Sequence, residues 1–415
     1  MNTKKHSFTT LLSLLFICSI SVFGQSKEVR KLHYAPEENA FVLKNGTRKF
    51  NRALYGSNTG FRVETGDLPE FAMYMPGMGG NFKLGITNGN ESKWITEASK
   101  IETRYVLGTM HYAIEDAILG NGKLFVDVVA LKEKEGFIVK VYGKGVSKNS
   151  NIIWAFGGAT GKKFSRDGDI GADPESVFYL RPEYCLGNKY TLQKQSFLLE
   201  YGSESNKQKT GNNKSLNGFF PESKVILTNA KNQNSPLELY NSKVEELPII
   251  SGKIKSISEK AIYWLFSPED LKMALPQKEI AQLYEKSVQE TQVLANRVKV
   301  KTPDPYINNL GFALSIASDG IWENPAYLHG AIAWRMYLNA WRGAYTADPL
   351  GWHDRAKTHF ASYSNSQVTS PESGPIVLDD EKTWHVKKKK LELQCSVAVI
   401  SAEIRIKIQS RIIMT

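Results

Sequence analysis

The sequence predicts a multidomain protein in which a β-rich region is followed by an α-helical region. Between Phe41 and about Phe266, short runs rich in Val, Ile, Phe and Tyr recur between turn residues, which is typical of all-β domains. From Gln277 onward the apolar residues recur with a helical period instead. This β pattern is long for one simple sandwich, so we expect a β-supersandwich, then a linker helix and the first helices of an α-helical domain.

The first 24 residues have the features of an export signal. Lys4 and Lys5 precede a short apolar run, Leu11–Ile17, and compact residues at Val22–Gly24 favour cleavage before Gln25. The apolar run is too short to span a membrane. We therefore expect a signal peptide over residues 1–24, a mature protein in the periplasm or outside the cell, and no membrane span.

Charge and cysteine content exclude two classes of protein. The formal net charge of +11 falls to about +4 when the +2 of the leader and the +5 of residues 387–415 are set aside. No basic stripe with interleaved aromatic residues remains, so nucleic acid is not an expected partner. Only three cysteines are present, Cys18, Cys185 and Cys395, which gives no disulfide framework.

We assign the β-supersandwich to residues 25–270 and a helical linker to residues 271–304. The clearest β runs are Lys123–Leu131, Phe137–Tyr142 and Ala261–Phe266. In the linker, the stretch Gln277–Val298 carries its apolar residues on one helical face. The next helix is expected over Pro305–Ser318, because Asp304 is a good N-cap and Pro305 suits the first turn.

Tryptophan is concentrated near the end of the chain. Five of the eight tryptophans fall between Ile321 and Trp384, among carboxylates, arginines and histidines. Indole rings stack on the apolar faces of sugars, and two acids that flank a glycosidic bond are sufficient to cleave it. The composition of this stretch therefore favours carbohydrate chemistry, with a polysaccharide or oligosaccharide as the partner.

Two carboxylates are the candidate catalytic residues. Asp348 is the first choice for a general acid, provided that Trp352 and Tyr345 shield it from water and raise its pKa. Asp348 equally fits an N-cap or an ion pair with Arg342. Glu323 is the second choice, and it equally fits a loop acid that caps a helix beginning near Pro325.

The candidate substrate-binding residues lie around these two acids. They are Trp322, Trp341, Trp352, Arg342 and His353. The three histidines His329, His353 and His359 do not have the spacing of a metal motif, so neither a metal site nor a cofactor is expected.

The composition changes abruptly at the C-terminus. Residues 386–415 contain no Gly, Pro, Asn, Asp, His or aromatic residue, and the change coincides with the four lysines Lys387–Lys390. A run of adenines would encode these lysines, and such runs invite insertion or deletion. We therefore expect residues 387–415 to be a frameshifted tail on a truncated chain. The alternative is a genuine pair of strands, Val397–Ile400 and Ile404–Ile408.

Two segments resemble a known family. The stretch Asn45–Phe71 resembles the opening of a domain of unknown function in large exported Bacteroidetes proteins, whose C-terminal half is a six-hairpin, (α/α)6 glycosidase-like barrel. The stretch Trp334–Arg355 resembles the first part of that barrel. The resemblance implies that residues 305–386 are the start of a glycosidase-like domain. About eighty residues hold only the first helices of such a toroid, which would be incomplete.

The pattern Asp348-Pro-Leu-Gly-Trp352 is also similar to that of rhamnosidase-type six-hairpin enzymes. In those enzymes an acid four positions before the Trp is the general acid, although it is Glu rather than Asp.

The sequence is compatible with two functions. The first is an exported glycoside hydrolase-like protein of polysaccharide degradation, which as written is expected to be a truncated and inactive fragment whose catalytic base is missing. The alternative is a glycan-binding or structural β-sandwich protein without catalysis.

Overall fold

The computed structural model describes residues 32–75, 78–158, 178–201, 215–244, 246–268, 275–330, 337–338 and 340–365. The expected signal peptide, the C-terminal tail and the Trp334 segment of the expected barrel lie outside these residues. Among the described residues, no helix is both long and apolar enough to cross a bilayer.

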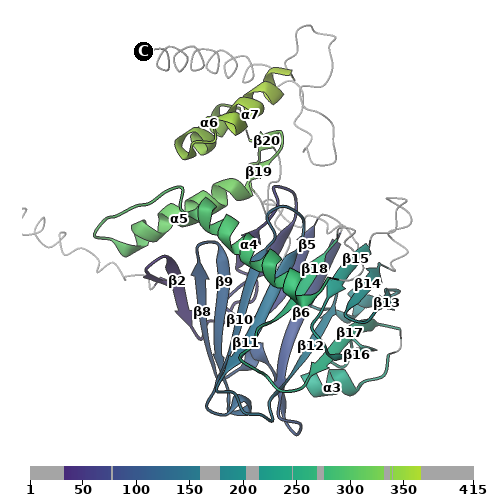
Figure 1. The fold of residues 1–415 in the computed structure, drawn as a ribbon. Helices are drawn as coiled ribbons and strands as arrows, with labels where there is room; N and C mark the ends of the chain where they lie inside the picture. Colours follow the sequence, from purple (N-terminus) through teal and green to yellow (C-terminus); the bar gives the residue numbers. More distant parts are fainter. Residues whose placement is uncertain are drawn as a thin grey trace, which may run out of the picture. The chain divides into compact units, whose positions relative to one another are not determined.

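The β region contains two large antiparallel sheets (Figure 1). The ten-stranded sheet, sheet A, has the order β1-β2-β8-β9-β10-β11-β18-β15-β14-β13. Its strands are β1 (Ala35–Glu37), β2 (Ala40–Lys44), β8 (Lys100–Val106), β9 (Thr109–Glu115), β10 (Lys123–Ala130), β11 (Phe137–Lys144), β13 (Lys189–Leu192), β14 (Ser196–Glu200), β15 (Ser215–Phe219) and β18 (Ile262–Ser267).

The second sheet, sheet B, has eight strands in the order β16-β17-β12-β6-β5-β4-β3, with β7 paired to β6. The strands are β3 (Arg52–Tyr55), β4 (Arg62–Thr65), β5 (Phe71–Met75), β6 (Met78–Thr87), β7 (Ser92–Trp94), β12 (Asn151–Gly157), β16 (Lys224–Asn229) and β17 (Pro248–Ile254). Short helical turns at Ile95–Glu97 (η1), Ala117–Leu119 (η2) and Pro182–Cys185 (η4) and the helix α3 (Pro236–Asn241) connect strands.

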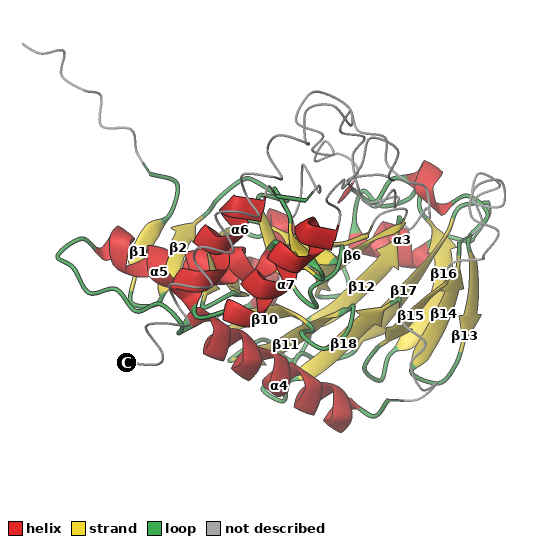
Figure 2. Cartoon of the chain, turned by 90° about the horizontal axis from the view of Figure 1, so that it is seen from above, coloured by secondary structure: helices red, strands yellow, loops and turns green. Residues whose placement is uncertain are grey.

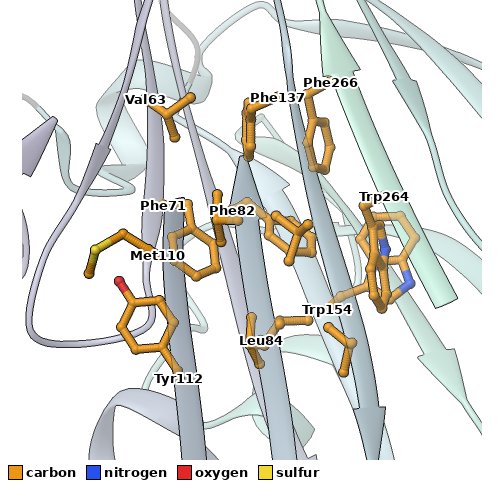
Figure 3. Close-up of a cluster of buried hydrophobic side chains, with 14 of the residues drawn as sticks. Val63, Phe71, Phe82, Leu84, Met110, Tyr112, Phe137, Trp154, Trp264 and Phe266 are labelled. Carbon is orange, nitrogen blue, oxygen red and sulfur yellow. The ribbon is translucent and has the colours of Figure 1, made fainter. Parts of the chain in front are cut away.

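The main hydrophobic core lies between the two sheets. The Phe82 ring of β6 lies 5.5 Å from that of Trp264 and 5.0 Å from that of Phe266, both on β18 (Figure 3). Phe156 of β12 stacks on Phe266 at 4.5 Å. Alternating residues of β10, Val126 among them, enter the same core. The sheets therefore bury one face each against the other, as the period-two pattern of their strands requires.

The outer face of sheet A is covered in part by α4 (Gln277–Ala295), which crosses β10, β11 and β18 (Figure 2). Ile280 and Tyr284 pack against Val129 and Leu265, so β10 is buried on both faces at this point. The side chain of Gln277 accepts a hydrogen bond from the Tyr263 N–H and donates one to the Tyr263 carbonyl. It thereby satisfies both backbone groups of that strand residue. The helix ends three residues before the expected limit, Val298.

Helix α5 (Pro305–Gly320) begins where the sequence predicts. The Asp304 carboxylate accepts hydrogen bonds from the Tyr306 and Ile307 N–H groups, as an N-cap does. Phe312 packs against Phe41 and Tyr105 of sheet A. The opposite side of the helix exposes Ile307, Leu310 and Leu314, by 46%, 46% and 59%.

A hairpin and two helices follow α5. Strands β19 (Trp322–Glu323) and β20 (Ala326–Tyr327) pair antiparallel, with a cis peptide bond between Asn324 and Pro325. The expectation of a helix beginning near Pro325 is therefore wrong, because that segment is the turn of the hairpin. Next come α6 (Ala340–Ala347), a 3-10 turn η5 (Asp348–Leu350) and α7 (His353–Asn365).

Candidate functional site

The region around the end of α5 contains a buried ionic centre at Asp319. One carboxylate oxygen lies 2.9 Å from the ammonium group of Lys132, which follows β10, and the other lies 2.9 Å from the guanidinium group of Arg355 on α7. The Asp319 side chain is 4% exposed. Burial alone would raise the pKa of this carboxyl, but Lys132 and Arg355 outweigh burial and hold the pKa below its usual value. Asp319 is therefore a charged, structural carboxylate.

The loop between β3 and β4 is attached to the same centre. The Asn58 amide donates a hydrogen bond to the Asp319 carbonyl (3.0 Å) and accepts one from Arg355 (3.3 Å). Lys132 also donates to the Gly56 carbonyl at 3.1 Å. At Gly320 a Cβ atom would lie 2.5 Å from the Tyr55 ring, so only glycine permits this close approach. These contacts connect the β3–β4 loop, the end of α5 and α7.

Two of the candidate sugar platforms meet at Arg355. The Arg355 guanidinium lies 4.6 Å from the ring centroid of Trp352 and 5.5 Å from that of Trp322. The Arg297 guanidinium also lies over Trp352, at 4.8 Å. Each tryptophan is 8% exposed. A sugar could stack on the Trp352 ring only if a guanidinium group moved away, because both cations already lie over it.

The carboxylate of Asp348 is accessible. It lies at the start of η5 with its side chain 30% exposed, and it forms a 3.2 Å hydrogen bond with Nδ1 of His353, whose side chain is 65% exposed. Tyr345 is itself 62% exposed, so it shields the Asp348 carboxyl little. Arg342 is exposed on α6. The structure therefore brings Asp348 and His353, two of the predicted site residues, together at the surface.

Glu323 is in a different environment. It is 7% exposed and lies on β19 beside Trp322.

Tyr327, opposite Trp322 in the hairpin, is buried. Burial raises the pKa of Tyr327 to about 12, although Arg355 opposes the shift. Its backbone N–H donates to Nδ1 of His359 at 3.0 Å, so the buried His359 is neutral with its proton on Nε2. Trp341 lies in α6, but its side chain is outside the described part of the chain.

Sequence reasoning did not find the ionic centre as a unit. In the structure Arg355 pairs with Asp319, and Lys132 comes from a strand end nearly two hundred residues away. The described residues contain no group of three or more His, Cys, Asp or Glu side chains that could hold a metal ion.

The comparison with solved structures returns partial similarities. A bacterial glucoamylase complexed with acarbose is 9% identical, with a TM-score of 0.44, and 80% of this chain matches 53% of that one. A putative kojibiose phosphorylase from the human microbiome is 9% identical, with a TM-score of 0.34, and 70% of this chain matches 41% of that one. The chain thus spans about half the length of these structures or less.

No curated protein matches the sequence. The family model described as a domain of unknown function, DUF4450, matches residues 75–302, which is more than half of the chain. The match begins just after Asn45–Phe71, the stretch on which the resemblance to such a domain was based. The chain belongs to the DUF4450 family.

Proposed function

We propose that the chain is a glycoside hydrolase-like protein that binds an oligosaccharide or polysaccharide at the surface formed by η5 and the start of α7. The observation that carries the proposal is the Asp348–His353 pair. Of the two predicted catalytic acids, Asp348 has the more accessible side chain, which is 30% exposed, whereas Glu323 is buried. Glycosidic cleavage needs a carboxyl that can reach the glycosidic oxygen, together with a second carboxylate.

In this proposal Asp348 is the general acid. The protonated carboxyl donates its proton to the glycosidic oxygen as the bond to the sugar breaks. The hydrogen bond between Asp348 and Nδ1 of His353 holds the carboxyl in place at this surface. Glu323 is the second candidate carboxylate, and it would have to become accessible to act. Arg342 and His353 are the proposed ligands of sugar hydroxyls.

The proposal extends to the architecture and the location of the protein. Helix α5, the hairpin, α6 and α7 would be the first elements of an (α/α)6 toroid, and the two sheets would be a β-supersandwich. The N-terminal pattern supports export to the periplasm or outside the cell, and polysaccharide degradation as the process.

The test is hydrolysis of a panel of oligosaccharides by the wild-type chain and by Asp348→Asn. The matched control is Asp354→Asn, an exposed acid one residue after His353. We expect Asp348→Asn to lower the rate of reducing-sugar release by about 100-fold or more, the range of general acid catalysis, and the control to retain it. Equal and measurable rates in the three proteins would remove Asp348 from the mechanism.

A second function is favoured by the packing of the tryptophans. Since Trp322 and Trp352 are mostly buried and lie against guanidinium groups, they can serve as structural residues of a glycan-binding or scaffolding protein. In that case the chain would bind a glycan without cleaving it, and Asp348→Asn would leave binding unchanged. The same panel, followed by binding as well as by product release, separates the two functions.

A further inference from the structure

An exposed arginine covers one of the candidate sugar platforms. Arg297 follows the end of α4, and its guanidinium group lies over the Trp352 ring, 4.8 Å from the ring centroid. Its Nη1 donates a hydrogen bond to the Leu350 carbonyl at 2.5 Å. Arg297 is exposed, whereas Trp352 is only 8% exposed. The Arg297 side chain therefore separates part of the indole from solvent.

The two guanidinium groups over Trp352 differ in how firmly they are held. Arg355 lies 2.9 Å from the buried carboxylate of Asp319 and is itself 23% exposed, so it can leave the ring only by separating a mostly buried ion pair. The partners of the Arg297 side chain among the described residues are one ring and one neutral carbonyl. Water can replace that hydrogen bond at an exposed position. Arg297 is therefore the cation that can move away from the ring.

The turn that carries Trp352 is held independently of Arg297. The Trp352 N–H donates to the Ala347 carbonyl at 2.9 Å, and the Gly351 N–H donates to the Asp348 carbonyl at 3.0 Å. Movement of Arg297 would open an indole face to solvent in the turn that begins at Asp348. An indole face attracts cations, and it also packs against flat apolar surfaces such as the C–H face of a pyranose ring. A guanidinium group and a neutral sugar ring therefore compete for this face.

We propose that Arg297 is a movable cover on a sugar-stacking subsite at Trp352, and that one neutral pyranose ring of an oligosaccharide takes the place of the guanidinium group. The inference rests on the proposed carbohydrate surface at η5 and the start of α7. It adds the ring that binds the sugar and the residue that limits the affinity. Because binding must first separate Arg297 from the ring and from the Leu350 carbonyl, the wild-type chain binds more weakly than a chain without this side chain.

The affinity for neutral sugars tests the cover. The probes are maltohexaose, cellohexaose, mannohexaose and xylohexaose, which carry no charge that the substitution could attract or repel. We expect Arg297→Ala to bind at least one of them about tenfold more tightly than the wild type, because no cation–π contact and no hydrogen bond has to be broken. The matched control is Lys299→Ala, which removes an exposed cation from the same segment and should bind as the wild type does.

Acrylamide quenching of tryptophan fluorescence measures the cover in the absence of sugar. The contribution of Trp352 is the difference between each protein and its Trp352→Phe counterpart. We expect Arg297→Ala to increase this contribution, because the ring becomes accessible, and a saturating hexasaccharide to lower it again. Unchanged quenching of Trp352 in Arg297→Ala would contradict the cover.

The binding results that contradict the inference are distinguishable from one another. Weaker binding by Arg297→Ala would make Arg297 a ligand of the sugar instead of a cover. Equal binding by Arg297→Ala and the wild type would leave the proposed carbohydrate surface without this subsite. No binding by any of the folded proteins, with Trp352 more accessible in Arg297→Ala, would overturn the subsite and the proposed carbohydrate surface together.

Discussion

At the scale of single residues, the account depends on which carboxylates are fixed and which are accessible. Asp319 is fixed by two cations and is charged, whereas Asp348 is partly exposed and bonded to a histidine. Both aspartates are followed within a few residues by a tryptophan. Local sequence therefore does not show which of the two carboxylates is buried in an ion pair. The cations that distinguish them come from distant positions, and only the folded chain brings them together.

Asp319 gives the sharpest prediction for stability. Asp319→Asn leaves Lys132 and Arg355 mostly buried without their counter-charge, so we expect a loss of about 3–5 kcal/mol in the free energy of unfolding. The matched control is Asp304→Asn at the other end of α5, which should have little effect because Asn caps a helix about as well as Asp. Urea denaturation at pH 7 measures both. A loss below about 1 kcal/mol for Asp319→Asn would mean that the centre is not structural.

The same residue predicts a dependence on pH. The folded-state pKa of Asp319 is depressed, so its contribution is fully present above the unfolded-state pKa, about 3.9, and is lost as the pH falls through the folded-state value. We expect melting temperatures of the wild type and of Asp319→Asn to converge below about pH 4. Parallel curves down to pH 2.5 would assign the difference to something other than the charge of Asp319.

At the scale of elements, local patterns predicted the regular structure well. The β10 and β11 runs, helix α4 and the N-cap of α5 lie within a few residues of the expected positions, because each follows from periodicity and capping. The β19–β20 hairpin was missed. Its two-residue strands carry too little pattern, and Pro325 was interpreted as a helix start.

The exposed face of α5 gives a prediction at this scale. Ile307, Leu310 and Leu314 form an apolar stripe, so we expect the chain to self-associate through it. Leu314→Lys should reduce the mass measured by light scattering toward that of a monomer, and it should change stability by less than about 0.5 kcal/mol. Ile316→Ala, on the buried side of the same helix, is the contrast, with an expected cost of about 2–5 kcal/mol. Unchanged scattering in Leu314→Lys would show that the stripe is not the contact.

At the scale of the whole molecule, the order of a β region followed by helices could be read from the change of hydrophobic period. The pairing of strands distant in sequence, such as β11 with β18 and β2 with β8, could not, because register is set by tertiary contacts. The same holds for the candidate site. The residues of the site could be identified from their residue types. Their burial could not, and neither could the two guanidinium groups over Trp352, because these depend on segments that are distant in sequence.

The measurement that tests the central claim most directly is the binding of an oligosaccharide panel by the wild type, His353→Ala and Lys357→Ala. His353 and Lys357 are both exposed on α7, so neither change should disturb the fold. The account predicts saturable binding of at least one oligosaccharide, weakened about tenfold by His353→Ala, the loss of one hydrogen-bonding group, and unchanged by Lys357→Ala. No binding by the folded wild type, or equal affinities in all three proteins, would contradict a carbohydrate site at this surface.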